Sequence, residues 1–79
     1  MRSKQYKLTW KTVGNPTVYT MGTYDKYSDA VRAYHTKLKE FGAEQTAHKR
    51  VNDENWFYTS TVGASDADWR DYIFTIKGV

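Results

Sequence analysis

The sequence has 79 residues, of which 39% are hydrophobic and 27% charged, with a formal net charge of +3 and no cysteine. A chain of this length is expected to form one small domain, residues 1–79, whose thin core excludes a large internal substrate cavity. The lack of cysteine excludes disulfides, thiolate zinc sites and cysteine nucleophiles, and it favours a cytoplasmic protein. Since the sequence has no run of about 18 apolar residues, we expect no membrane partner.

The first expected element is a half-buried strand over residues 4–13, because apolar and polar residues alternate there with the period of a strand. The inner face carries Tyr6, Leu8 and Trp10, and the outer face carries Lys7, Thr9 and Lys11. Glycine and proline predict a turn at residues 14–16. Residues 17–23, rich in β-branched and aromatic side chains, then complete a hairpin. The basic residues 1–7 are not followed by an apolar run, so we expect no signal peptide.

A helix over residues 28–41 is the next predicted element. Ser28 is the predicted N-cap, and Gly42 is the residue expected to end the helix in a left-handed conformation. Between them the apolar residues recur at intervals of three and four, which places them on one stripe of the helix. The stripe consists of Tyr27, Ala30, Val31, Tyr34, Leu38 and Phe41.

The last part of the sequence predicts three more strands. Residues 44–51 are polar on both faces and indicate an edge strand. The remaining predicted segments are a turn at 52–55, a strand at 56–62, a polar loop at 63–68 and a strand at 70–77. The order β-β-α-β-β-β indicates an α+β fold, an antiparallel sheet of about five strands with one amphipathic helix packed on one face. The opposite face is then left open, and we expect function there.

Positive charge is concentrated in the first part of the chain. Residues 1–50 hold ten lysines and arginines against four acidic residues, which is +6, whereas residues 51–79 hold two against five, which is −3. Cations interleaved with aromatic rings are typical of surfaces that bind polyanions, since lysine and arginine neutralise phosphates and rings stack on bases. The candidate residues for binding nucleic acid or another partner are Arg2, Lys4, Lys7, Lys11, Lys49, Arg50, Trp56, Tyr58 and Trp69. Of these, Arg2 and Lys4 are expected to form a flexible arm.

Trp69 has a second interpretation. It lies beside Arg70 among Asp66, Asp68 and Asp71, and an aromatic anchor flanked by charges is typical of a protein–protein contact. The alternative is a solvated loop whose tryptophan folds back onto the core. The sequence leaves both open.

No enzyme motif is present, and we expect neither catalysis, nor a metal, nor a cofactor. The chain lacks a glycine-rich phosphate loop and the common zinc and serine-hydrolase motifs. A nuclease is the enzymatic alternative, in which one of His35 and His48 would act as the base and the other as the acid. Both are expected on polar, solvated faces, and neither has an acidic partner at ligand spacing on its own element.

Residues 19–42 carry Gly22-Thr23-Tyr24-Asp25, then Ala30, Ala33-Tyr34 and Gly42. This spine resembles the last strand and helix of the ethylene-response-factor-type DNA-binding domain, in which a helix supports a sheet whose strands enter the major groove. The resemblance implies that Lys7, Thr9 and Lys11 and the outer side of the second strand face DNA. It covers less than a third of the chain, and the arginine-rich reading strands of that family are missing here.

Three functions follow from these observations. The first is a nucleic-acid-binding module that uses the basic N-terminal arm and the sheet. The second is a small inhibitor or adaptor, of the kind found in phages and mobile elements, that docks on a host protein complex. The third is a small nuclease or toxin. An exposed edge at 44–51 permits either a monomer or a weak homodimer.

Overall fold

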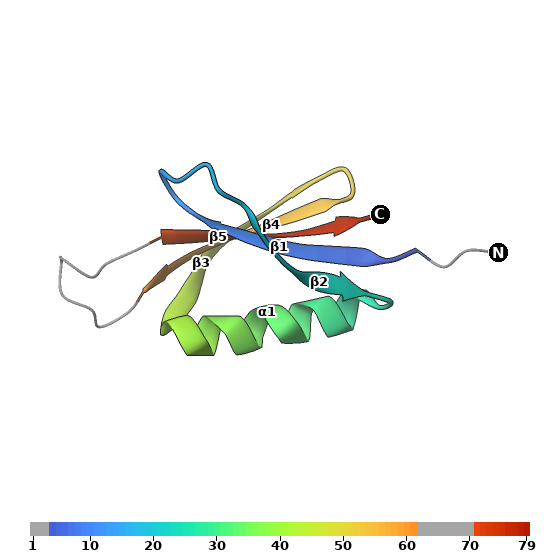
Figure 1. Ribbon diagram of the computed structural model, residues 1–79, viewed down its shortest axis with the longest axis horizontal. Coiled ribbons are helices and arrows are strands. Elements are labelled where there is room, and N and C mark those ends of the chain that lie inside the picture. Colours follow the sequence, from blue (N-terminus) through green and yellow to red (C-terminus); the bar gives the residue numbers. More distant parts are fainter. Residues whose placement is uncertain (1–3, 62–70) are drawn as a thin grey trace.

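The computed structural model describes residues 4–61 and 71–79, and this part of the chain holds five strands and one helix. The elements are β1 (Tyr6–Thr12), β2 (Tyr19–Tyr24), α1 (Tyr27–Phe41), β3 (Ala43–Val51), β4 (Glu54–Thr61) and β5 (Asp71–Gly78). All strand pairs are antiparallel and form one sheet, and α1 crosses one of its faces (Figure 1). The predicted α+β fold, with one helix on one sheet, is confirmed.

The strand order is β2-β1-β5-β4-β3, so the last strand in the chain lies at the centre of the sheet. β5 pairs with β1 on one side and with β4 on the other, and thereby joins two local hairpins into one sheet. The backbones of Gln5 and Val79 extend the β1–β5 ladder by two further hydrogen bonds, of 3.3 and 2.8 Å. Within the described residues no helix is long and apolar enough to cross a membrane.

The helix begins one residue earlier than predicted. Its N-cap is Lys26, whose carbonyl accepts the backbone N–H groups of Asp29 and Ala30 at 3.1 and 3.3 Å. The prediction of Ser28 as the N-cap is therefore wrong: Ser28 already lies within the first turn, and no side chain caps the helix. At the other end Gly42 has φ of 65°, and its N–H bonds to carbonyls of the last turn, as its lack of a Cβ predicts.

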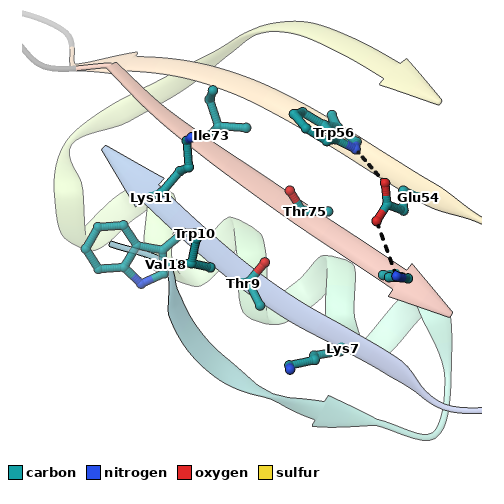
Figure 2. A pocket seen from close by; sticks show the side chains of 10 residues that line it. Lys7, Thr9, Trp10, Lys11, Val18, Glu54, Trp56, Ile73 and Thr75 are labelled. Carbon is teal, nitrogen blue, oxygen red and sulfur yellow. Dashed lines mark hydrogen bonds and ion pairs between the residues drawn. The ribbon is translucent and has the colours of Figure 1, made fainter. Parts of the chain in front are cut away.

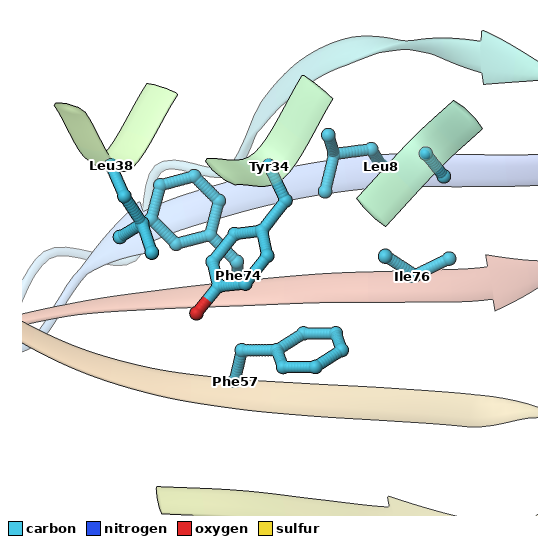
Figure 3. Close-up of a cluster of buried hydrophobic side chains, with 7 residues drawn as sticks. Leu8, Tyr34, Leu38, Phe57, Phe74 and Ile76 are labelled. Atoms are coloured by element: carbon cyan, nitrogen blue, oxygen red, sulfur yellow. The ribbon is translucent and has the colours of Figure 1, made fainter. Parts of the chain in front are cut away.

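The core lies between α1 and the inner face of the sheet (Figure 3). It is built from Leu8, Ala30, Tyr34, Leu38, Phe57, Phe74 and Ile76, all buried. Rings dominate the packing: Tyr34 stacks on Phe57 with centroids 4.6 Å apart, and Trp10 meets Phe41 edge to face at 5.1 Å. Large rings suit a small domain because each buries much area and loses little side-chain freedom. The helix stripe and the inner face of the first strand are confirmed as core-facing.

The turn between β3 and β4 is shorter than predicted. Only Asn52 and Asp53 form it, and Asn52 adopts φ of 54°, a conformation that asparagine tolerates better than most residues. Glu54 and Asn55 belong to β4, so the predicted four-residue turn is wrong there. Cross-strand pairing decided this, because Glu54 pairs with both Val51 and Lys77.

β3 is confirmed as an edge strand. Residues 44–51 are all exposed, and only Ala43 is partly covered. The pairing with β4 is irregular between Gln45 and Ala47, which twists the edge. The predicted loop at 63–68, together with Val62 and Arg70, lies outside the described residues.

Candidate functional site

The open face, by which we mean the face of the sheet opposite α1, collects the outward residues of the strands. Lys7, Thr9 and Lys11 leave β1 on this side because Leu8 and Trp10 turn toward the helix. Figure 2 shows this face with the helix behind the sheet, and the side chains of Trp56 and Thr75 lie on it. Strict alternation along each strand therefore separates the core from a second, partly polar surface.

A hollow of about 330 Å³ lies on the open face. Three strands, β1, β5 and β4, form its floor, and one residue of the β1–β2 turn borders it. It is lined by Lys7, Thr9, Trp10, Lys11, Val18, Glu54, Trp56, Ile73, Thr75 and Lys77. With three lysines and one glutamate, the lining carries a formal charge of +2.

The indole of Trp56 is held in place within this hollow. Its Nε1–H donates to Glu54 Oε2 at 3.3 Å, and Glu54 Oε1 lies 3.6 Å from the Nζ of Lys77 (Figure 2). Glu54 and Trp56 leave β4 two residues apart on the same face, so the hydrogen bond draws the ring along the strand. The Lys77 ammonium also offsets this carboxylate, the one acidic group among the described residues that line the hollow.

Positive charges meet across the β1–β5 ladder. Lys7 lies directly opposite Lys77, and Lys11 lies opposite Ile73. Among residues 4–61 and 71–79, Lys7 and Lys11 take part in no ion pair, whereas Lys77 has Glu54. Like charges directly opposite each other on a sheet are destabilising. The fold thus tolerates a pair of facing lysines beside the hollow, in which Lys77 has an acidic partner and Lys7 has none among the described residues.

Two further predicted residues lie on the open face next to Trp56. Lys49 is its cross-strand neighbour on β3, and Tyr58 is two residues farther along β4, between Ile73 and Ala47. The structure therefore brings together five of the nine predicted site residues: Lys7, Lys11, Lys49, Trp56 and Tyr58.

Arg50 does not belong to this group. It pairs with Asn55 and points to the helix side of the sheet, while its neighbour Lys49 points to the open face. Arg50 borders a second hollow of about 240 Å³, beside Tyr27. Burial raises the pKa of Tyr27, and the Arg50 guanidinium opposes that rise. Strand alternation sends neighbouring residues to opposite faces, so these two cations serve different surfaces.

The predicted N-terminal arm is only partly described. Lys4 forms an ion pair with Asp53 at 3.4 Å and lies over the ring of Tyr6 at 5.9 Å. Lys4 is therefore held beside the β3–β4 turn, not extended as an arm. Arg2 and Trp69 lie outside the described residues, as do Asp66 and Asp68 of the predicted acidic loop.

The histidines occupy separate elements. His35 lies on the exposed side of α1 and has its ring 5.0 Å from that of Tyr34. His48 stacks in parallel on Phe57 at 4.6 Å, and its Nε2 lies 3.0 Å from Asn55 Oδ1, so its ring packs against the sheet despite its exposed position. In the described part of the chain no three side chains of metal-ligand type come together.

Sequence reasoning missed several residues that line the hollow, among them Lys77, Glu54 and Val18. Strand alternation after Ile76 indicates that Lys77 faces outward, but its position opposite Lys7 depends on the β1–β5 register. Glu54 was assigned to a turn and Val18 to the second strand. No local signal places any of these three in the hollow, because the hollow is assembled from strands far apart in the sequence.

No protein-family model, curated protein or solved structure matches the chain.

Proposed function

We propose that the protein is a non-enzymatic module that binds nucleic acid through the open face of its sheet. One observation carries the proposal: Lys7 and Lys11 project from this face without an ion pair among the described residues, beside a hollow that contains Trp56. Unpaired lysines neutralise phosphates and release counterions, which supplies affinity. A cytoplasmic location, favoured by the lack of cysteine, belongs to the same proposal.

The opposition of Lys7 and Lys77 supports a role in binding rather than in folding. A cross-strand pair of like charges lowers stability, and an acidic residue at position 7 would instead face a lysine. A bound phosphate removes the repulsion.

The test is the double variant Lys7→Glu, Lys11→Glu. We expect its affinity for a labelled oligonucleotide to fall at least about tenfold at low salt, because a unit charge pair near contact is worth about 1 kcal/mol even in water. The slope of log K against log salt concentration should become shallower by about 2, one for each lysine. Fluorescence anisotropy across a salt titration measures both quantities.

The matched control is Lys26→Glu with Arg32→Glu, which makes the same change in net charge at two exposed positions, the N-cap of α1 and the helix itself. It should bind nearly as the unmodified protein does. The free energy of unfolding of Lys7→Glu, Lys11→Glu should be unchanged or higher, since the new carboxylate at position 7 would face Lys77. Absence of binding by the unmodified protein to DNA and RNA, even at low salt, contradicts the proposal.

A second candidate is a small inhibitor or adaptor that docks on a host protein. The exposed β3 edge favours it, because free backbone groups along a nine-residue strand can accept a strand from a partner. Such a complex would depend on salt far less than one made by phosphate contacts. Salt titration therefore separates the two candidates.

A further inference from the structure

The indole of Trp56 is positioned to stack on a planar ligand. Its indole borders the hollow, it is only partly buried, and its Nε1 is already occupied by Glu54 at 3.3 Å. The ring therefore offers its π-face, and not its hydrogen-bond donor, to an incoming group. Since the Glu54 contact holds the side chain, a ligand that stacks there causes little further loss of rotamer freedom.

The cations lie on both sides of this ring and are spread over several strands, so they match several phosphates better than one ion. Lys49 is the direct cross-strand neighbour of Trp56 on one side, while Lys7 and Lys11 lie on β1, two strands away on the other. Four residues along a strand separate Lys7 from Lys11 by about 13 Å. The ligand that matches this surface is a polymer with an anionic backbone and planar groups.

A double helix does not fit the site. A face of five strands is about 19 Å wide, from four gaps of about 4.8 Å, whereas the major groove is about 12 Å wide and admits an α-helix or a two-stranded ribbon. In a duplex both faces of each base are covered by neighbouring bases, so no base face is free to stack on an indole. An unpaired strand presents its base faces without that unstacking cost.

We propose that the open face binds single-stranded nucleic acid, with one base stacked on Trp56 and the backbone phosphates beside Lys7, Lys11 and Lys49. This inference rests on the proposed function and narrows its ligand to unpaired DNA or RNA. The hollow of about 330 Å³ lies at the lower end of the range for ligand pockets, which suits one planar base. Thr9 and Thr75, side by side on its floor, place hydroxyl groups near that base.

The experiment compares three labelled oligonucleotides of one sequence, about 12 nucleotides long: single-stranded DNA, single-stranded RNA and the DNA duplex. The protein should bind at least one single strand more tightly than the duplex at equal salt. Trp56→Ala should lower single-strand affinity about 5- to 150-fold, the range measured for loss of one stacked base. Trp56→Phe keeps a π-face and should retain most of the affinity.

Two readouts separate stacking from mere folding. Trp56→Ala should leave the salt slope unchanged, because no phosphate contact is lost, and circular dichroism should show the same sheet. Tyr19→Ala is the control, since it removes an exposed ring that stacks on Trp10 on the helix side of the sheet. The Tyr19→Ala variant should bind single strands with the same affinity as the unmodified protein.

Tighter binding to the duplex overturns the inference, as does full affinity in a folded Trp56→Ala protein. If Lys7→Glu, Lys11→Glu still loses binding in either case, the proposed function stands and only the single-stranded ligand is wrong. Failure of the unmodified protein to bind any of the three oligonucleotides overturns both.

Discussion

Tyr34 shows how a single residue connects the core to the edge of the sheet. Its side chain is fully buried, its ring packs on Phe57 and Phe74, and its hydroxyl donates to Gln45 Oε1 at 3.0 Å. Burial raises the pKa of Tyr34 to about 12, because the interior disfavours the phenolate. The hydrogen bond ties the middle of α1 to β3, the strand with the least covering.

Replacing Tyr34 by phenylalanine removes this hydroxyl and tests both effects. At pH 7 we expect the free energy of unfolding to fall by about 0.5–1.5 kcal/mol, the usual worth of one hydrogen bond. Because the pKa of Tyr34 is higher in the folded state, its contribution is complete below pH 10 and is lost as the pH rises from 10 to about 12.

The difference in stability between the unmodified protein and Tyr34→Phe should therefore shrink above pH 10. Urea titrations at intervals from pH 8 to 11.5 measure it, and the titration of every other group cancels in the comparison. A difference that stays constant over this range would show that the phenol is not desolvated in the folded state.

At the scale of the element, the role of β3 depends on its position at the edge of the sheet. It is exposed on both faces from Glu44 to Val51, and it carries Lys49 and Arg50 near its end. Charged side chains on an edge strand discourage pairing with a second copy of the same protein. The irregular pairing near Thr46, whose hydroxyl donates to the carbonyl of Tyr58 at 3.1 Å, works in the same direction.

Removal of these charges should promote self-association. Lys49→Val with Arg50→Val leaves a β-branched edge without charge, and we expect oligomers whose fraction rises with protein concentration, measured by size-exclusion chromatography with light scattering. The same substitutions at Arg32 and Lys39, exposed positions of α1, should leave the elution unchanged. Equal association of both variants would mean that overall charge, not the edge, controls it.

At the scale of the whole molecule, β5 decides whether there is one sheet or two separate ribbons. It contributes Phe74 and Ile76, both fully buried, and it pairs along its length with β1 and β4. It also brings Lys77 opposite Lys7 and Thr75 beside Trp56, so the hollow on the open face exists only when β5 is in place.

A fragment of residues 1–70 should consequently fail to fold. Burial of each large apolar side chain is worth about 1.5–3 kcal/mol, and a domain of this size is stable by only about 4–12 kcal/mol in total. We expect no cooperative thermal transition by circular dichroism, and recovery of one when a peptide of residues 71–79 is added. A cooperative transition in the fragment alone would show that the remaining strands already form the core.

The local patterns of the sequence determined much of this protein. Alternation at Tyr6, Leu8 and Trp10 predicted which face of β1 is buried, and Gly42 predicted where α1 ends, because both depend on residues close in the chain. One error arose where the pairing partner is distant, since Glu54 joined β4 beside Lys77. The other error was local: the N-cap is Lys26, so Ser28 lies inside the first turn and does not cap the helix.

Only the tertiary structure decided the strand order and hence the candidate site. The residues near Lys7 in the sequence do not indicate that Lys77 lies opposite it, or that Trp56 lies two strands away. Register across a sheet is set by the packing of the whole core, since a slip of one residue would turn every side chain to the other face. The sequence alone therefore supplied the outward lysines and rings, and the position of β5 between two hairpins assembled them into one surface.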